Sequence, residues 1–133
     1  MLSCGAVTKG LKGKELTDMQ VLLDAGAVGF TDDGIPILDR ELLRIAFERS
    51  AALSVPVSLH EEDASLITNN GINRGAASAH FGIGGSPREA EITMIEKDLQ
   101  VALETGAIVN IQHISTKEGV ELVRKAKAVP GNR

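Results

Sequence analysis

Three side chains that can bind a metal, Asp33, His60 and His113, each stand at the end of a short, largely apolar run of the sequence. The carboxyl ends of parallel strands lie on one edge of a sheet, so residues placed last on successive strands converge there although they are distant in the chain. Two imidazoles and a carboxylate match the nitrogen and oxygen ligands that zinc prefers, and three protein ligands plus a water form a hydrolytic arrangement. The pattern predicts a metal site, or part of one, at the edge of a parallel sheet.

Each candidate ligand also has a plainer interpretation. A histidine at a strand end, such as His60 or His113, often only makes a hydrogen bond. Asp33 lies in the sequence Asp32-Asp33-Gly34, which is typical of a turn because Asp and Gly are favoured there for conformational reasons. The metal hypothesis therefore rests on the three positions together and on none of them alone.

The carboxyls of Glu61 and Glu62 follow His60 directly. Such a pair can act as acid or base groups in a hydrolase. We favour a supporting role, in which one of them holds a ligand ring in place and the other faces water. The glycine-rich sequence at 82–85 lacks the spacing and the preceding strand of a phosphate loop, and it predicts a flexible loop.

Strands and helices are predicted to alternate along the chain. Strands are expected in the apolar runs 2–7, 28–33, 55–60 and 108–113. Helices are expected between and after them, with N-terminal caps at Thr17, Asp39, Ser86 and either Ser115 or Thr116. Residues 61–85 are rich in Gly and Asn and predict a long loop, a feature that is usually functional or mobile in a compact domain.

This alternation predicts an α/β fold with a parallel sheet. Two arrangements of this sheet remain possible, an open doubly wound sheet or a segment of an eight-stranded barrel. We count about four strands, whereas a complete barrel needs eight strands and about 250 residues. An apolar run that begins at residue 2, and Val129-Pro130-Gly131 where a turn before another strand would lie, favour the barrel segment.

Composition excludes several classes of function. With 133 residues, 43% of them hydrophobic, the chain can form one domain with a core. The net charge of −4 and the absence of a basic patch argue against nucleic acid as a partner. No apolar run reaches the roughly 20 residues that span a bilayer, so no membrane association is expected. The single cysteine, Cys4, fits a reducing compartment, and a cytoplasmic location is predicted.

Seven motifs follow one another along the chain: Gly5-Ala6-Val7-Thr8-Lys9-Gly10, Gly13-Lys14-Glu15-Leu16, Phe30-Thr31-Asp32-Asp33-Gly34, His60-Glu61-Glu62-Asp63, Gly85-Ser86-Pro87, Ala90-Glu91 and Gln112-His113-Ile114-Ser115-Thr116. In this order they resemble the middle of a dihydroorotase, of the bacterial type I class within the amidohydrolase superfamily. The resemblance covers nearly the whole chain. The Asp-Asp-Gly strand end separates this class from dihydropyrimidinases, allantoinases and other dihydroorotases, which have a carboxylated lysine at that point.

The resemblance implies a (β/α)8 barrel with two zinc ions that interconverts dihydroorotate and N-carbamoyl-L-aspartate in pyrimidine biosynthesis. It implies that Asp33 bridges the two zinc ions and that His60 and His113 bind the second one. Asp32 and Glu61 are expected to be secondary, although the sequence leaves open an exchange of roles between Asp32 and Asp33. The family commonly has Cys at the position of Glu61, so we expect altered packing there and no lost metal bond.

Residues 1–133 are expected to be the central segment of a single amidohydrolase barrel, without its N-terminal and C-terminal parts. The family's His-x-His pair, the arginine beside it and the catalytic aspartate have no counterpart in this chain. We therefore expect no catalytic residue here, at most one bound zinc, and no activity of the chain alone. Its unpaired sheet edges predict a homo-oligomer.

Two alternatives to a dihydroorotase remain. The first is another cyclic amidohydrolase, such as allantoinase, and the Asp-Asp-Gly strand end counts against it. The second is an inactive homologue that serves as a structural partner of aspartate transcarbamoylase. Retention of Asp33, His60 and His113 counts against this second alternative. A small-molecule substrate is the partner expected of the enzyme.

Overall fold

A parallel sheet of four strands, in the order β1-β2-β3-β4, forms the centre of the computed structural model, which describes residues 1–68 and 71–130. The strands are β1 (Ser3–Gly5), β2 (Ala27–Thr31), β3 (Val57–Leu59) and β4 (Val109–Ile111). Each strand pairs in parallel with the next one along the chain. The predicted α/β class and parallel sheet are confirmed.

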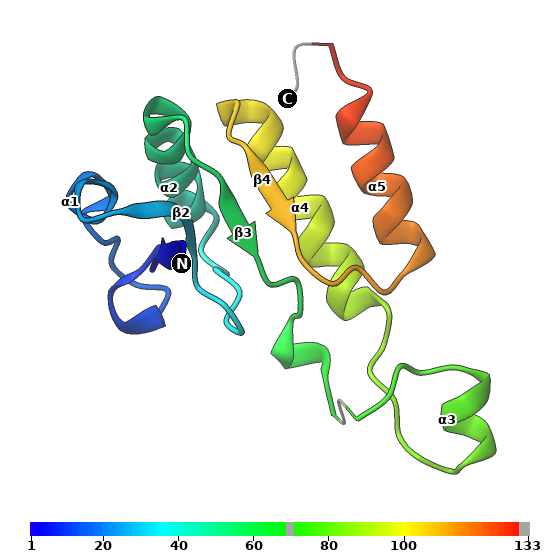
Figure 1. Ribbon diagram of the computed structural model, residues 1–133. Coiled ribbons are helices and arrows are strands. Elements are labelled where there is room, and N and C mark those ends of the chain that lie inside the picture. Colours follow the sequence, from blue (N-terminus) through cyan, green and yellow to red (C-terminus); the bar gives the residue numbers. More distant parts are fainter. Residues whose placement is uncertain (69–70, 131–133) are drawn as a thin grey trace.

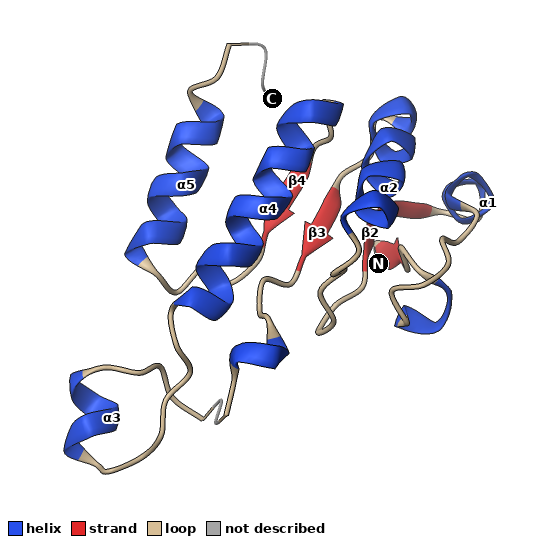
Figure 2. Ribbon diagram, turned by 180° about the vertical axis from the view of Figure 1, so that it is seen from behind, coloured by secondary structure: helices blue, strands red, loops and turns tan. Residues whose placement is uncertain are grey.

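The helices are η1 (Lys9–Leu11), α1 (Met19–Asp24), α2 (Arg40–Leu53), η2 (Ala64–Leu66), α3 (Ala76–His80), α4 (Glu89–Thr105) and α5 (Lys117–Lys127). Four of them, α1, α2, α4 and α5, form a layer on one face of the sheet. In Figure 1 the strands β3 and β4 lie in front of α2 and α4, and in Figure 2, seen from behind, the helices lie in front. A doubly wound sheet has helices on both faces, so sequential strands covered on one face are those of a barrel segment.

Two of the predicted helix caps are confirmed. The Asp39 carboxylate accepts hydrogen bonds from the backbone N–H groups of Glu41 (2.9 Å) and Leu42 (3.0 Å), at the start of α2. The Thr116 hydroxyl accepts one from the N–H of Gly119, at 3.0 Å, at the start of α5. Both caps satisfy amides that have no partner within the first turn of the helix.

The other two predicted caps are wrong. Asp18 caps α1 by accepting from the N–H of Val21 at 3.2 Å. The hydroxyl of Thr17 instead donates to the carbonyl of Ala6 at 2.6 Å, because Thr17 lies beside the end of β1. The helix α4 begins only at Glu89, and Ser86 pairs by its backbone with the loop before it: its N–H donates to the carbonyl of Ile72 at 2.9 Å.

The loop predicted over 61–85 is partly regular. It contains the short elements η2 and α3, and it extends away from the sheet (Figure 1). Asn69 and Asn70 of this loop, and Gly131 of the predicted C-terminal turn, lie outside the described residues. None of the described helices is both long and apolar enough to cross a membrane.

The core lies between the sheet and the helices. Phe30 of β2, Val57 of β3 and Leu43 and Phe47 of α2 have no exposed surface. A second apolar cluster joins α4 to α5 through Ile95, Leu99 and Ala126. Because both clusters are on the helical side, packing fixes the strands from one face only.

Gly119 of α5 allows this helix to approach α4. A Cβ atom added there would lie 2.8 Å from the Cδ1 atom of Ile95 and 2.8 Å from the hydroxyl oxygen of Thr116. We expect Gly119→Ala to lower the free energy of unfolding by about 1–2 kcal/mol, since overpacking outweighs the gain in helix propensity. Urea denaturation measures this, with Lys125→Ala on the exposed side of the same helix as the control. Equal or greater stability of the Gly119 variant would contradict the close packing.

Candidate metal site

The carboxyl ends of β3 and β4 bring His60 and His113 together. His60 follows Leu59 directly, and Leu59 is aligned with Ile111, two residues before His113. The Nδ1 atom of His60 lies 3.0 Å from the Nε2 atom of His113, and the rings meet edge to face. Two nitrogen ligands of one tetrahedral zinc ion lie roughly 3.3 Å apart. The pair therefore fits a shared zinc ion as well as it fits a hydrogen bond between imidazoles.

The backbone of His113 is strained. Its φ angle is +36°, in a region that residues with side chains rarely adopt. Such conformations cost about 1–3 kcal/mol and are found most often at active sites and binding sites. The strain is an independent indication that the position of this ring serves a function.

Asp33 does not join the two histidines in a compact group. The strand β2 ends at Thr31, and Asp33 is exposed in the turn that follows, which the N–H of Ile35 closes by donating to the carbonyl of Asp32 at 2.9 Å. Within residues 1–68 and 71–130, no three His, Cys, Asp or Glu side chains are gathered closely enough to hold a metal ion. The structure thus brings together two of the three predicted ligands, and the role of Asp33 stays a prediction.

Asp32 has a structural position inside the protein. Its side chain is buried and accepts hydrogen bonds from the backbone N–H groups of Val7 (2.8 Å) and Thr8 (3.0 Å) and from the hydroxyl of Thr8. These bonds join the chain after β1 to the chain after β2. The carboxylate is therefore already bound to protein donors, and its secondary role at the metal site stays a prediction.

The two glutamates after His60 have different environments. An Oε2 atom of Glu62 lies 3.5 Å from the Nε2 atom of His60, the ring nitrogen that does not face His113. This is the position expected of a carboxylate that orients a ligand ring. Glu61 is only 3% exposed, so the expectation that the second glutamate faces water is wrong.

Glu61 lies beside another buried carboxyl group, Asp98 of α4. Burial raises the pKa of Glu61, and the negative charge of Asp98 raises it further, while Lys97 opposes this shift. Burial also raises the pKa of Asp98, against the lowering effect of Lys97. Lys97 pairs with Asp98 at 3.1 Å and donates to the carbonyl of Ile37 at 2.7 Å. We conclude that Glu61 holds a proton near neutral pH and Asp98 carries the charge.

The proton on Glu61 makes stability depend on pH. Because folding raises its pKa, the stabilising contribution of this group is complete below its unfolded pKa near 4.5 and is lost as the pH rises through its folded pKa. The variant Glu61→Gln is neutral at every pH. The unmodified chain should lose stability between pH 5 and pH 8, and the variant should not lose this contribution. We therefore expect the free energy of unfolding of the variant minus that of the unmodified chain to be larger at pH 8 than at pH 5, by on the order of 1–3 kcal/mol. Urea denaturation at both pH values measures this, and parallel pH profiles for the two proteins would contradict the buried proton.

Glu91 of α4 fixes the chain after His113. Its carboxylate accepts from the N–H of Ser115 (2.7 Å), the hydroxyl of Ser115 (3.0 Å) and the N–H of Thr116 (2.8 Å). Although burial raises the pKa of Glu91, these hydrogen bonds prevail and lower it below the usual range. No sequence pattern predicts this role of Glu91, because the contact joins residues that are far apart in the chain.

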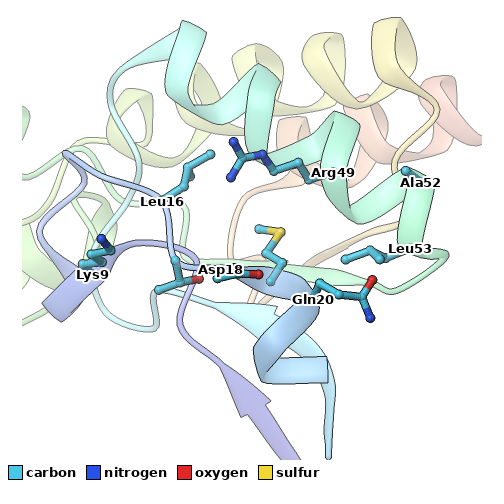
Figure 3. Close-up of a pocket in the computed structure, with 9 residues that line it drawn as sticks. Lys9, Leu16, Asp18, Gln20, Arg49, Ala52 and Leu53 are labelled. Atoms are coloured by element: carbon cyan, nitrogen blue, oxygen red, sulfur yellow. The ribbon is translucent and has the colours of Figure 1, made fainter. Parts of the chain in front are cut away.

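Of two cavities in the structure, one is lined by His113 and the other by neither histidine of the pair. One of about 120 Å³ is lined by His113, Glu61, Glu62 and Glu91, among other residues. Pockets for small molecules usually have 300–1,000 Å³, so these residues form only part of a pocket. A cavity of about 460 Å³ lies between α1 and α2 and contains none of the candidate ligands (Figure 3). We place the site at the histidines, because barrel enzymes carry out their chemistry at the carboxyl ends of the strands.

Comparison with known proteins identifies the family. A sequence model described as "Dihydro-orotase-like" matches residues 1–119. The chain belongs to this dihydroorotase-like family. The resemblance drawn from the sequence motifs is thus confirmed.

Individual relatives agree with this assignment. A protein named dihydroorotase from Clostridioides difficile is 47% identical over 127 residues, which are 96% of this chain and 30% of that protein. One from Clostridium acetobutylicum is 42% identical over 132 residues, which are 99% of this chain and 31% of that protein. The chain therefore spans about a third of the length of these dihydroorotase relatives.

Solved structures support the fold of this dihydroorotase-like chain. It superposes on an L-hydantoinase (dihydropyrimidinase) from Arthrobacter aurescens with a TM-score of 0.72 and 22% sequence identity, over 98% of this chain and 30% of that one. A D-hydantoinase gives a TM-score of 0.62 and 20% identity, over 84% of this chain. The predicted fold, a part of a (β/α)8 barrel, is confirmed.

Proposed function

We propose that this chain supplies part of the metal site of a dihydroorotase, a zinc enzyme that interconverts dihydroorotate and N-carbamoyl-L-aspartate. The observation that carries the proposal is the pair His60 and His113, with ring nitrogens 3.0 Å apart at the carboxyl ends of adjacent strands, in a member of the dihydroorotase-like family. The strained backbone of His113 adds support.

His60 and His113 would hold one zinc ion, and Asp33 would bridge it to a second one. A bound zinc ion would polarise the amide carbonyl of the substrate. Within this chain, Glu62 orients the ring of His60, and Glu91 holds the backbone that follows His113. Glu61 is an uncharged neighbour that lies beside Asp98 and is not itself a metal ligand.

We also propose that residues 1–133 form the central segment of one barrel domain and are inactive by themselves. Support comes from the relatives, of which the chain spans about 30%. No group of three ligands is gathered in the described part of the chain, and the cavity beside His113 is small. Both facts fit a site that needs further residues from the rest of a barrel.

A chimaera tests the proposal. The matching segment of the Clostridioides difficile dihydroorotase is replaced by this chain, which is 47% identical to it. We expect the folded chimaera to hydrolyse dihydroorotate and to retain zinc after dialysis, and the isolated chain to show no activity. A folded chimaera that binds zinc but acts only on allantoin or hydantoin would contradict the substrate assignment. A folded chimaera without zinc would contradict the site.

A further inference from the structure

The helix α4 contacts the loops that follow two of the candidate ligands. It lies between α2 and α5 on the helical side of the sheet (Figure 2). The carbonyl of Ala90, in the first turn of this helix, accepts a hydrogen bond of 2.9 Å from the N–H of Asp63, in the loop after His60. The carboxylate of Glu91 holds the chain that follows His113. One helix thus fixes the loops behind both histidines.

Lys97 of the same helix contacts the loop that carries Asp33. Its Nζ atom donates a hydrogen bond of 2.7 Å to the carbonyl of Ile37, which lies 60 residues earlier in the chain. The same Nζ atom lies 3.1 Å from the carboxylate of Asp98, whose side chain is 2% exposed. Hydrogen bonds from a charged donor are stronger than those between neutral groups, and a low local dielectric strengthens them further. Lys97 therefore forms a strong link between α4 and the loop that joins β2 to α2.

The loop that carries Asp33 is fixed on both sides of this residue. Before it, the buried carboxylate of Asp32 accepts hydrogen bonds from backbone N–H groups that follow β1. After it, Ile37 is buried and Lys97 holds its carbonyl. Asp33 itself is exposed between these points, so the backbone of the loop determines where its carboxylate lies. Such support matters at a metal site, which requires its ligands within about 0.5 Å of the productive geometry.

We propose that Lys97 is a positioning residue of the metal site, which holds the loop bearing Asp33 through the carbonyl of Ile37. The inference rests on the proposed function, in which Asp33 bridges two zinc ions. The Nζ atom of Lys97 binds a backbone carbonyl and not a ligand, so the loop transmits its effect to the site. The helix α4 then supports the loops of all three candidate ligands.

Zinc binding by the chimaera with the Clostridioides difficile enzyme tests the proposal. Lys97→Met removes the donor and leaves an unbranched side chain of similar length. We expect the zinc affinity to fall about 10-fold, as it does when a group that orients a metal ligand is lost. Lys97→Arg keeps a charged donor and should restore most of the affinity. Lys125→Met, at an exposed position of α5, is the control and should change nothing. Equilibrium dialysis against a zinc buffer measures all four proteins.

A second variant separates positioning from charge balance. Lys97→Met also leaves the buried carboxylate of Asp98 without its cation, and a buried unpaired charge destabilises the fold. Adding Asp98→Asn removes that charge, so the double variant should resist urea better than Lys97→Met alone. It should still bind zinc about 10-fold more weakly than the chimaera does. Full recovery of zinc affinity in the double variant would overturn the proposal, since Lys97 would then act only by balancing Asp98.

Hydrogen exchange in the metal-free chimaera measures the loop directly. Loss of one hydrogen bond from a charged donor corresponds to a change of about 10-fold or more in a local opening equilibrium. We expect amide exchange in residues 32–38 to become faster by about this factor in Lys97→Met, and exchange in residues 114–120 to stay unchanged. The double variant with Asp98→Asn serves for this measurement if Lys97→Met does not fold. Unchanged exchange in residues 32–38 would overturn the proposal.

Asp33→Ala shows which proposal has failed if the zinc affinity of Lys97→Met is normal. Loss of zinc in Asp33→Ala together with normal affinity in Lys97→Met would overturn only the positioning role of Lys97. An Asp33→Ala chimaera that keeps all of its zinc would contradict the bridging role of Asp33 and, with it, that part of the proposed function.

Discussion

Replacing His113 by alanine in the chimaera with the Clostridioides difficile enzyme is expected to lower dihydroorotate hydrolysis by at least about 100-fold. Disturbing only the outer partner of a metal ligand typically costs 10–100-fold, and this substitution removes a proposed ligand itself. The Nε2 atom that is lost lies 3.0 Å from His60 Nδ1, so the substitution leaves His60 as the remaining member of the pair. Steady-state rates at saturating zinc measure the effect, and elemental analysis measures the zinc that remains bound.

His80→Ala is the matched control for this substitution. His80 is exposed in α3, where its ring contacts only Phe81 among the aromatic rings of the described residues. We expect this variant to keep the rate and the zinc content of the chimaera. If His113→Ala behaves like His80→Ala, the histidine pair is a structural hydrogen bond and the proposed site is wrong.

His60→Ala should lower the rate as much as His113→Ala does. The double variant should then be little worse than either single variant, because the two rings act as one unit and their effects do not add. Additive losses would indicate that the two histidines act separately. This outcome would argue against a shared zinc ion.

Asp32→Ala is expected to lower the free energy of unfolding by about 3–5 kcal/mol. The substitution leaves the N–H groups of Val7 and Thr8 and the hydroxyl of Thr8 without their acceptor, inside a region where Val7 and Thr8 are at most 1% exposed. Each buried polar group left unsatisfied costs about 1–3 kcal/mol. Urea denaturation of the chain without added metal measures the loss.

The substitution Asp33→Ala distinguishes the role of Asp33 from that of Asp32. Asp33 is exposed, so its loss should change the stability of the metal-free chain by no more than about 0.5 kcal/mol. In the chimaera, the same substitution should remove zinc, as expected of a bridging ligand. The reverse result, a large stability loss at Asp33 and a zinc loss at Asp32, would show that the two residues exchange roles.

The residue types and their order determine the fold class and the histidine pair. The apolar runs end in ligands at His60 and His113, and a parallel sheet places the ends of adjacent strands at one edge, so their proximity follows from local patterns and topology. The caps Asp39 and Thr116 likewise follow from local chemistry, since each side chain reaches amides two or three residues ahead. The family could be recognised for the same reason, because its motifs are short and contiguous.

Tertiary structure decides which member of each adjacent pair faces the protein interior. Asp32 and Asp33 have the same side chain, yet only Asp32 reaches the amides after β1. Glu61 is buried beside Asp98, whereas Glu62 faces His60. A shift of one residue turns a side chain to the opposite face, so the outcome depends on where each strand ends.

Local sequence patterns also do not predict contacts between distant segments. Thr17 has the chemistry of a helix cap, but the end of β1 offers its hydroxyl a carbonyl, and Asp18 takes the cap instead. Asp98 lies at helical spacing within the apolar stripe of α4. This spacing predicts that its carboxyl group is buried, but it does not predict which groups surround it. Local patterns of residues suffice to predict the strands, the main helices and the paired histidines, because these depend on neighbours along the chain. The positions of the buried carboxyl groups follow only from the folded structure, because their partners are brought close when the sheet and helices pack.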